Sequence, residues 1–110
     1  MAAEAFSDFE SFWPFYVSQH RDATCRMLHL TGTAIGVVCL ALGVFAPPLF
    51  LAAPVAGYGL AWIGHFVFEK NKPATFQHPL WSLRGDFRMF RLMLTGRMDR
   101  ALADAAERYA

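Results

Sequence analysis

The chain carries no Asp, Glu, Lys or Arg between Met27 and Phe68, and a Pro47-Pro48 pair interrupts this apolar run near its middle. Each half is close to the length of about 20 apolar residues that a membrane-spanning helix requires. Consecutive prolines favour a turn over a continuous helix. The pattern therefore predicts a hairpin of two antiparallel helices, over residues 23–46 and 49–70, that spans a membrane.

Residues 5–21 precede the hairpin and carry ring side chains at helical spacing. These are Phe6, Phe9, Trp13, Tyr16 and His20. The run Ser7-Asp8-Phe9-Glu10 has the form of a capping box, which marks the start of a helix. We expect an amphipathic helix whose aromatic stripe lies at the membrane interface, where Trp and Tyr side chains are enriched.

Two further helices are predicted after the hairpin. Residues 79–95 combine an apolar stripe at helical spacing with Arg84, Arg88 and Arg91, which is typical of a basic helix that lies on an anionic membrane surface. Residues 97–109 are a short polar segment that we expect to form the terminal helix. Amphipathic helices are therefore predicted on both sides of the hairpin.

The composition favours a membrane protein over a soluble one. Only 17% of the 110 residues are charged and the mean hydropathy is +0.28, which we interpret as one membrane domain over residues 1–110. The first residues lack the basic-then-apolar pattern of a signal peptide. Basic residues flank the open ends of the hairpin and are absent from its turn, so both termini are expected in the cytoplasm. A formal net charge of +1 gives no indication of nucleic-acid binding.

Histidines on the two predicted spans lie at the same level. His29 and His65 are at similar distances from the proline turn, so antiparallel packing brings them together. A break near Asp22 would let His20 join them, because His20 and His29 would face opposite ways on one continuous helix. Glu69 follows His65 by about one helical turn and shares its face. Imidazole nitrogens with one carboxylate favour iron or zinc, although a single interfacial histidine is also common as a simple aromatic partner.

Three segments carry these histidines: Tyr16–His20, Leu28-His29 and Gly64–Ala74. Together they resemble the Mpo-type membrane proteins, typified by the fungal 2-hydroxy fatty acid dioxygenase, and the resemblance extends from about Phe12 to Phe90. It implies an iron(II)-dependent α-oxidation, in which a 2-hydroxy long-chain fatty acid and dioxygen give a fatty acid one carbon shorter. It also implies catalytic, iron-binding roles for His20, His29 and His65, with Glu69 matching the acid that follows the last histidine. The fungal members are longer and have more spans.

The hairpin geometry agrees with such a reaction. The paired histidines lie about 26 Å from the turn, near the cytoplasmic edge of a hydrocarbon layer about 30 Å thick. A fatty acid carboxylate would lie at that level, where four basic side chains could pair with it: Lys70, Lys72, Arg21 and Arg84. We expect an integral protein of a bacterial inner membrane; the corresponding membrane in the fungal relatives is the endoplasmic reticulum.

Two other functions stay open from the residues alone. A hairpin between interfacial helices can act as a non-enzymatic membrane scaffold or as a partner-binding subunit. Small residues recur on both spans, including the pairs Gly32/Gly36 and Gly57/Ala61, which suit close helix packing and are compatible with a homo-oligomer. Transport of protons or metal ions is disfavoured, because the inner half of each span carries no acid or histidine.

Overall fold

The computed structural model describes residues 6–109, and within that range the chain forms five α-helices. These are α1 (Phe9–Ser18), α2 (Ala23–Leu42), α3 (Leu49–Ile63), α4 (Pro79–Leu94) and α5 (Met98–Arg108). A π-helical turn, η1 (Gly64–Glu69), continues α3, and a 3-10 turn, η2 (Ala74–Phe76), precedes α4. The prediction of an all-helical chain is confirmed. Residue 5, the expected start of the first helix, and residues 1–4 and 110 of the expected domain lie outside the described residues.

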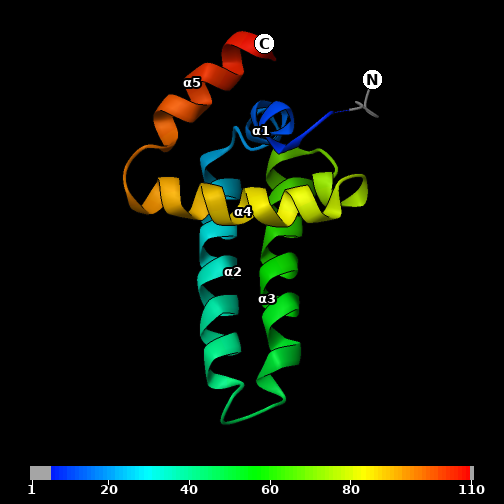
Figure 1. Ribbon diagram of the computed structural model, residues 1–110, viewed down its shortest axis with the longest axis vertical. Coiled ribbons are helices and arrows are strands. Elements are labelled where there is room, and N and C mark those ends of the chain that lie inside the picture. Colours follow the sequence, from blue (N-terminus) through cyan, green and yellow to red (C-terminus); the bar gives the residue numbers. More distant parts are fainter. Residues whose placement is uncertain (1–5, 110) are drawn as a thin grey trace.

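The long helices α2 and α3 lie side by side as an antiparallel hairpin (Figure 1). α2 begins after Asp22, whose carboxylate accepts a hydrogen bond from the Cys25 backbone N–H at 2.9 Å. The helix ends at Leu42 and not at residue 46, because Pro47 has no backbone N–H to offer the Gly43 carbonyl oxygen and its ring would clash with that carbonyl in a continued helix. Two helices, of 20 and 21 residues, are long and apolar enough to cross a membrane, the second of them formed by α3 and η1 together.

Glycines bring α2 and α3 into backbone contact. A Cβ atom built on Gly32 would lie 3.1 Å from the carbonyl oxygens of Ala56 and Gly57, and one on Gly36 would lie 3.3 Å from that of Ala53. Such contacts are tighter than ordinary van der Waals contact, so a larger residue at Gly32 would push the helices apart. The small residues of α2 therefore serve packing within the hairpin.

Most apolar side chains of the hairpin point outward. Only 17% of the apolar window in α2, and 22% of that in α3 and η1, is buried. Phe45 and Leu51, which lie next to the turn, are 86% and 76% exposed. A helix in the core of a soluble protein would be mostly buried, so this surface suits a lipid environment.

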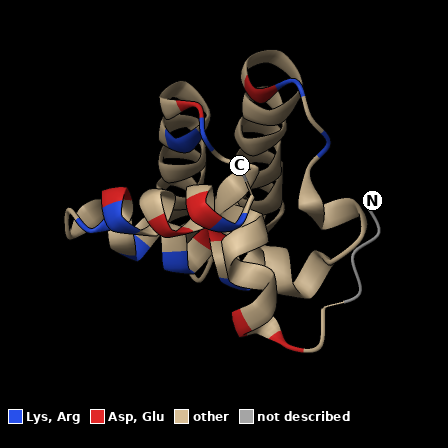
Figure 2. Ribbon diagram, turned by 90° about the horizontal axis from the view of Figure 1, so that it is seen from above, with Lys and Arg blue, Asp and Glu red and all other residues tan. Residues whose placement is uncertain are grey.

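The helices α1, α4 and α5 form a cap at the open end of the hairpin, and α4 crosses both long helices there (Figure 1). The largest buried cluster lies in this cap and consists of Phe9, Phe12, Tyr16, Val17, Met89, Met98 and Ala105. Acidic and basic residues also gather at this end of the molecule (Figure 2).

Arg88 joins α4 to α1, because its guanidinium donates two hydrogen bonds to the Glu10 carboxylate, at 3.0 and 2.8 Å. These hydrogen bonds lower the pKa of Glu10 below its ordinary value.

The start of α1 differs from the sequence prediction. Asp8 and Ser11 form the capping box, in place of Ser7 and Glu10. The Asp8 carboxylate accepts from the Ser11 backbone N–H at 2.8 Å, and the Ser11 hydroxyl oxygen accepts from the Asp8 backbone N–H at 3.3 Å. Ser and Asp are both good N-caps, so neighbouring residues of these types compete for the position. Pro14 lies inside α1, which continues through it to Ser18.

Candidate metal centre

Three histidines from three separate elements meet under the cap. His20 follows α1, His29 lies near the start of α2, and His65 lies in η1; their side chains are 0%, 4% and 2% exposed. The ring centroids are 4.5 to 4.9 Å apart, and one nitrogen from each ring lies within 4.8 Å of the other two. The expectation that the three imidazoles converge is confirmed.

Each imidazole is oriented by an oxygen acceptor at its Nδ1 atom. The distances are 2.6 Å from His20 to the Tyr16 carbonyl oxygen, 2.9 Å from His29 to the Cys25 carbonyl oxygen, and 2.7 Å from His65 to Asn71 Oδ1. A carbonyl oxygen can only accept, so each Nδ1 carries the proton and each Nε2 presents a lone pair. Metal-binding histidines have this arrangement, in which the outer hydrogen bond fixes the tautomer.

The facing lone pairs are suited to hold a cation between them. The Nε2 atoms of His20 and His29 are 3.2 Å apart, and neither has a proton to donate when both Nδ1 atoms donate to carbonyl oxygens. Two buried acceptors at this distance repel each other unless a positive charge lies nearby. Burial, followed by the charges of His29 and His65, holds the pKa of His20 well below its ordinary value, which favours the neutral, ligating form.

The break between α1 and α2 brings His20 to the site, as the sequence predicted. Arg26 stabilises the connection by donating hydrogen bonds to the carbonyl oxygens of His20, at 2.9 Å, and Arg21, at 2.7 Å. The Glu69 carboxylate accepts a hydrogen bond from the backbone N–H of Asp22 in the same connection. Glu69 lies outside the group of three nitrogens, so the described geometry gives it a positioning contact.

The π-helical turn η1 presents His65 to the site. Its end is marked by Lys70, which adopts a left-handed conformation with φ of 59°, and Asn71 then folds back so that its backbone N–H donates to the His65 carbonyl oxygen at 3.0 Å. The Asn71 side chain also donates to the Gln19 carbonyl oxygen at 3.1 Å. A π-helical turn inserts an extra residue into a helix and is frequent at functional sites. Here it links His65 to the segment that carries His20.

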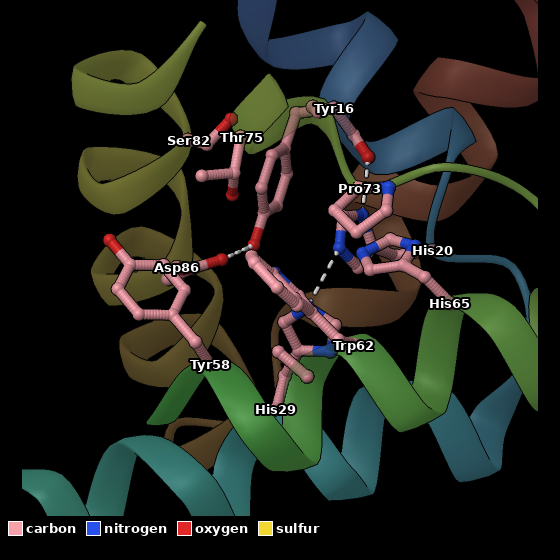
Figure 3. A pocket seen from close by; sticks show the side chains of 12 residues that line it. Tyr16, His20, His29, Tyr58, Trp62, His65, Pro73, Thr75, Ser82 and Asp86 are labelled. Atoms are coloured by element: carbon pink, nitrogen blue, oxygen red, sulfur yellow. Dashed lines mark hydrogen bonds between the residues drawn. The ribbon is translucent and has the colours of Figure 1, made fainter. Parts of the chain in front are cut away.

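Tyr16 and Asp86 form a second polar pair beside the histidines (Figure 3). The Tyr16 ring stacks on the His20 ring with 4.1 Å between centroids, and its hydroxyl donates a hydrogen bond to Asp86. Burial raises the pKa of the Asp86 carboxyl to about 7, although the hydrogen bond from Tyr16 opposes this change. Burial and the neighbouring carboxylate raise the pKa of Tyr16.

A small cavity lies between this pair and the histidines. Its volume is about 10 Å³, which is room for roughly one water-sized group. Tyr58, Trp62 and Ser82 also line it (Figure 3). The indole N–H of Trp62 and the hydroxyl of Ser82 are buried without a hydrogen-bond partner among the described residues. Buried polar atoms of this kind are available to a water molecule or to a polar ligand in the cavity.

Asp86 and Asn71 had no role in the sequence analysis. Asp86 occupies an apolar position of α4, because Leu83, Phe87 and Phe90 recur around it at helical spacing. A single acid within an apolar stripe was therefore the signal available for it. Asn71 offered no comparable signal, because its contact with His65 depends on the left-handed turn at Lys70.

The four basic residues expected to pair with a substrate carboxylate do not line the cavity. Arg21 donates a hydrogen bond to the Tyr109 carbonyl oxygen, and the Arg84 guanidinium lies 4.2 Å from the centre of the Phe9 ring. Lys70 and Lys72 are exposed next to the site. The fourth histidine, His78, is also outside the centre, and its half-buried ring packs on Phe12 and Trp81.

The fold and the site together define a helical protein with two candidate membrane spans and a buried three-histidine cluster suited to a transition metal. The family model of the 2-hydroxy-palmitic acid dioxygenase Mpo1-like proteins matches residues 6–98, so the chain belongs to the Mpo1-like family. No curated protein and no solved structure matches the chain significantly.

Proposed function

We propose that this protein is an integral membrane dioxygenase that uses iron(II), held by His20, His29 and His65, to shorten 2-hydroxy long-chain fatty acids by one carbon. The observation that carries the proposal is the convergence of three Nε2 atoms whose Nδ1 partners are all oxygen acceptors. Imidazole ligands suit iron, and three of them leave coordination positions open. The family match supports the substrate class.

The exposed apolar surface supports insertion of the hairpin into a bilayer. Lipid is the environment in which the exposed apolar side chains of α2 and α3 are stable. On α4, Leu80 and Leu94 are 80% and 64% exposed, which suits a helix that lies at the membrane interface. With α4 at that level, the histidine cluster lies where a fatty acid carries its carboxyl group. Both termini are then on the cytoplasmic side, in keeping with the distribution of basic residues.

The residues around the cavity have separate roles in the proposed reaction. Iron(II) held by His20, His29 and His65 would supply electrons for the reduction of dioxygen and open coordination positions for the 2-hydroxy acid. The free donors of Trp62 and Ser82 hold oxygen atoms of the substrate, because both atoms are buried and unpaired. Asp86 accepts the proton of the substrate hydroxyl at the carboxylate oxygen that Tyr16 leaves free, since a pKa of about 7 lets it exchange protons near neutrality. The small volume excludes bulk water.

The basic residues around the open end act on the approach of the substrate. Lys70 and Lys72 are exposed beside η1 and attract the carboxylate of a fatty acid in the cytoplasmic leaflet. Arg21 and Arg84 contribute to the same positive field, although each also makes a contact within the protein. Glu69 positions the connection before α2 by accepting from the Asp22 backbone N–H.

The test measures metal content and dioxygen uptake together. The protein is purified without oxygen in mild detergent, reconstituted with iron(II), and compared with His29→Ala, His65→Ala and the control His78→Phe, which changes the histidine outside the cluster. We expect near-stoichiometric iron in the wild type and in the control, and its loss in the two cluster variants. Addition of 2-hydroxypalmitate should then cause dioxygen uptake and release of the acid one carbon shorter.

Two outcomes would contradict the proposal. A wild-type protein that retains no iron after reconstitution has no iron centre. A protein that retains iron but consumes no dioxygen with any 2-hydroxy acid is not a dioxygenase of these substrates, and a role as a membrane scaffold would then explain the hairpin better.

A further inference from the structure

An apolar groove runs down the hairpin from the histidine cluster. Its volume is about 320 Å³, within the range of small-molecule binding sites. Four residues, His29, Tyr58, Ala61 and Asp86, line both the groove and the small cavity at the cluster. A ligand that reacts at the histidines can therefore extend directly into the groove.

The residues of α2 that line the groove show its direction and length. They recur on one face of the helix, as His29, Gly32, Thr33, Gly36, Val37 and Leu40. From His29 to Leu40 this face extends about 16 Å at 1.5 Å per residue. One leaflet of a hydrocarbon layer is about 15 Å deep, so the groove has the depth that one long acyl chain occupies.

The chemistry of the groove changes with depth. Its polar side chains, on His29, Thr33, Tyr58 and Asp86, come from the part of each helix nearer the cluster. Farther from the cluster it is lined by aliphatic residues, which are Val37, Leu40, Ala53 and Pro54. This gradient matches a molecule with one polar end and one hydrocarbon tail. A helix from a second copy fits less well. A helical segment of the same length and about 10 Å in diameter occupies roughly 1,000 Å³, which is more than the groove volume of about 320 Å³.

We propose that this groove binds the hydrocarbon tail of the 2-hydroxy acid and that its distal part, from Val37 to Leu40, determines the longest tail it accepts, an inference that rests on the function proposed above. Val37 lies about 12 Å from His29 along α2, so a large side chain there would close only the distal part of the groove. Val37 is 43% exposed, so it can be enlarged without disturbing a buried core.

The chain offers a closely matched control. Val38 is the next residue of the same helix, has the same side chain and is 55% exposed, but it does not line the groove. A Gly57→Leu variant is designed to close the part of the groove nearer the histidine cluster. Gly57 lies opposite Gly32, and a Cβ on Gly57 would lie 3.9 Å from the Gly32 carbonyl oxygen, so the backbone leaves room for a side chain there.

The experiment measures binding without turnover. Wild type, Val37→Trp, Val38→Trp and Gly57→Leu are loaded with iron(II), placed in lipid nanodiscs and titrated anaerobically with 2-hydroxypalmitate and with 2-hydroxyoctanoate. We expect Val37→Trp to weaken binding of the long acid by about tenfold or more and to leave the short acid unchanged. Gly57→Leu should weaken binding of both acids, and Val38→Trp should behave as wild type.

Each outcome decides between the two proposals. If Val37→Trp and Val38→Trp bind the long acid equally well, the groove does not bind the hydrocarbon tail. The same conclusion follows if the wild type retains iron but binds neither acid. A Val37→Trp variant that changes self-association and not chain-length preference would assign the groove to a second copy. If the binding pattern is as expected but admission of dioxygen produces no uptake, the groove assignment stands and the proposed reaction fails.

Discussion

The Nε2 atoms of His20 and His29 face each other at 3.2 Å in a buried site, while the Nδ1 atoms of both rings donate to backbone carbonyl oxygens. This pairing leaves two lone pairs without a proton between them. We therefore expect the facing acceptor nitrogens of His20, His29 and His65 to be more stable with a cation between them than without one.

Removal of the metal should lower stability. A ligand present at 100 times its dissociation constant stabilises the folded state by about 2.7 kcal/mol, so chelation should lower the midpoint of thermal unfolding by several degrees. The measurement is thermal unfolding in detergent with and without added iron(II) or zinc(II). His29→Ala should show no dependence on metal, and a wild type with the same midpoint in both conditions would contradict a metal centre.

Asn71 should control metal affinity through His65. Its Oδ1 atom accepts from His65 Nδ1 at 2.7 Å, and loss of such a partner commonly reduces metal affinity by about 10 to 100 times. Asn71→Leu removes the acceptor, whereas Asn71→Asp retains an acceptor for His65 while it loses the donor to the Gln19 carbonyl oxygen and adds a negative charge. Competition with a chelator of known affinity should show a large loss for Asn71→Leu and a small one for Asn71→Asp. Equal losses would assign Asn71 a role in folding instead.

Gly64 should be required for the approach of η1 to α2. A Cβ at this position would lie 2.8 Å from Cys25 Sγ and 3.1 Å from Cys25 Cα, so Gly64→Ala must displace the turn that carries His65. We expect a loss of about 1–3 kcal/mol of stability together with weaker metal binding. Gly59→Ala is the control, because a Cβ there meets nothing within 4 Å. Unfolding midpoints and metal affinities measured for both variants test this, and a Gly64→Ala protein with wild-type values for both would refute it.

Asp86 should make stability depend on pH. Burial raises its pKa to about 7 in the folded protein, above the ordinary value of 3.8, so the folded state binds this proton more tightly than the unfolded state. The resulting stabilisation is complete below about pH 4 and disappears as the pH rises through about 7. Asp86→Asn lacks this dependence, so wild type should lose stability relative to the variant as the pH rises from about 4 to about 7.

The control for this pH effect is Asp99→Asn, which changes an exposed acid on α5. Thermal unfolding of the three proteins across the pH range gives the comparison. A difference between wild type and Asp86→Asn that is constant with pH would mean that Asp86 does not hold the proton in the folded state.

Several parts of the molecule follow from local sequence pattern. A charge-free run broken by Pro47-Pro48 predicts two long helices with a turn, because helix length and proline geometry are local properties. The equal spacing of His29 and His65 from that turn predicts their proximity, since rise per residue is nearly constant in helices. Asp22 was identified as the break that brings His20 to the same place, and its carboxylate caps α2.

Other parts were decided only by packing between distant elements. Asn71 reaches His65 because the chain ends a π-helical turn with a left-handed residue, and Asp86 reaches Tyr16 because α4 crosses the hairpin at the cap. The Glu69 carboxylate accepts a hydrogen bond from the Asp22 backbone N–H because η1 lies beside the connection between α1 and α2. A pattern along one helix specifies which residues share a face, whereas the partner of each face depends on how the helices cross. The sequence alone therefore determined the hairpin and its three histidines, and the tertiary structure decided which groups hold those histidines in place.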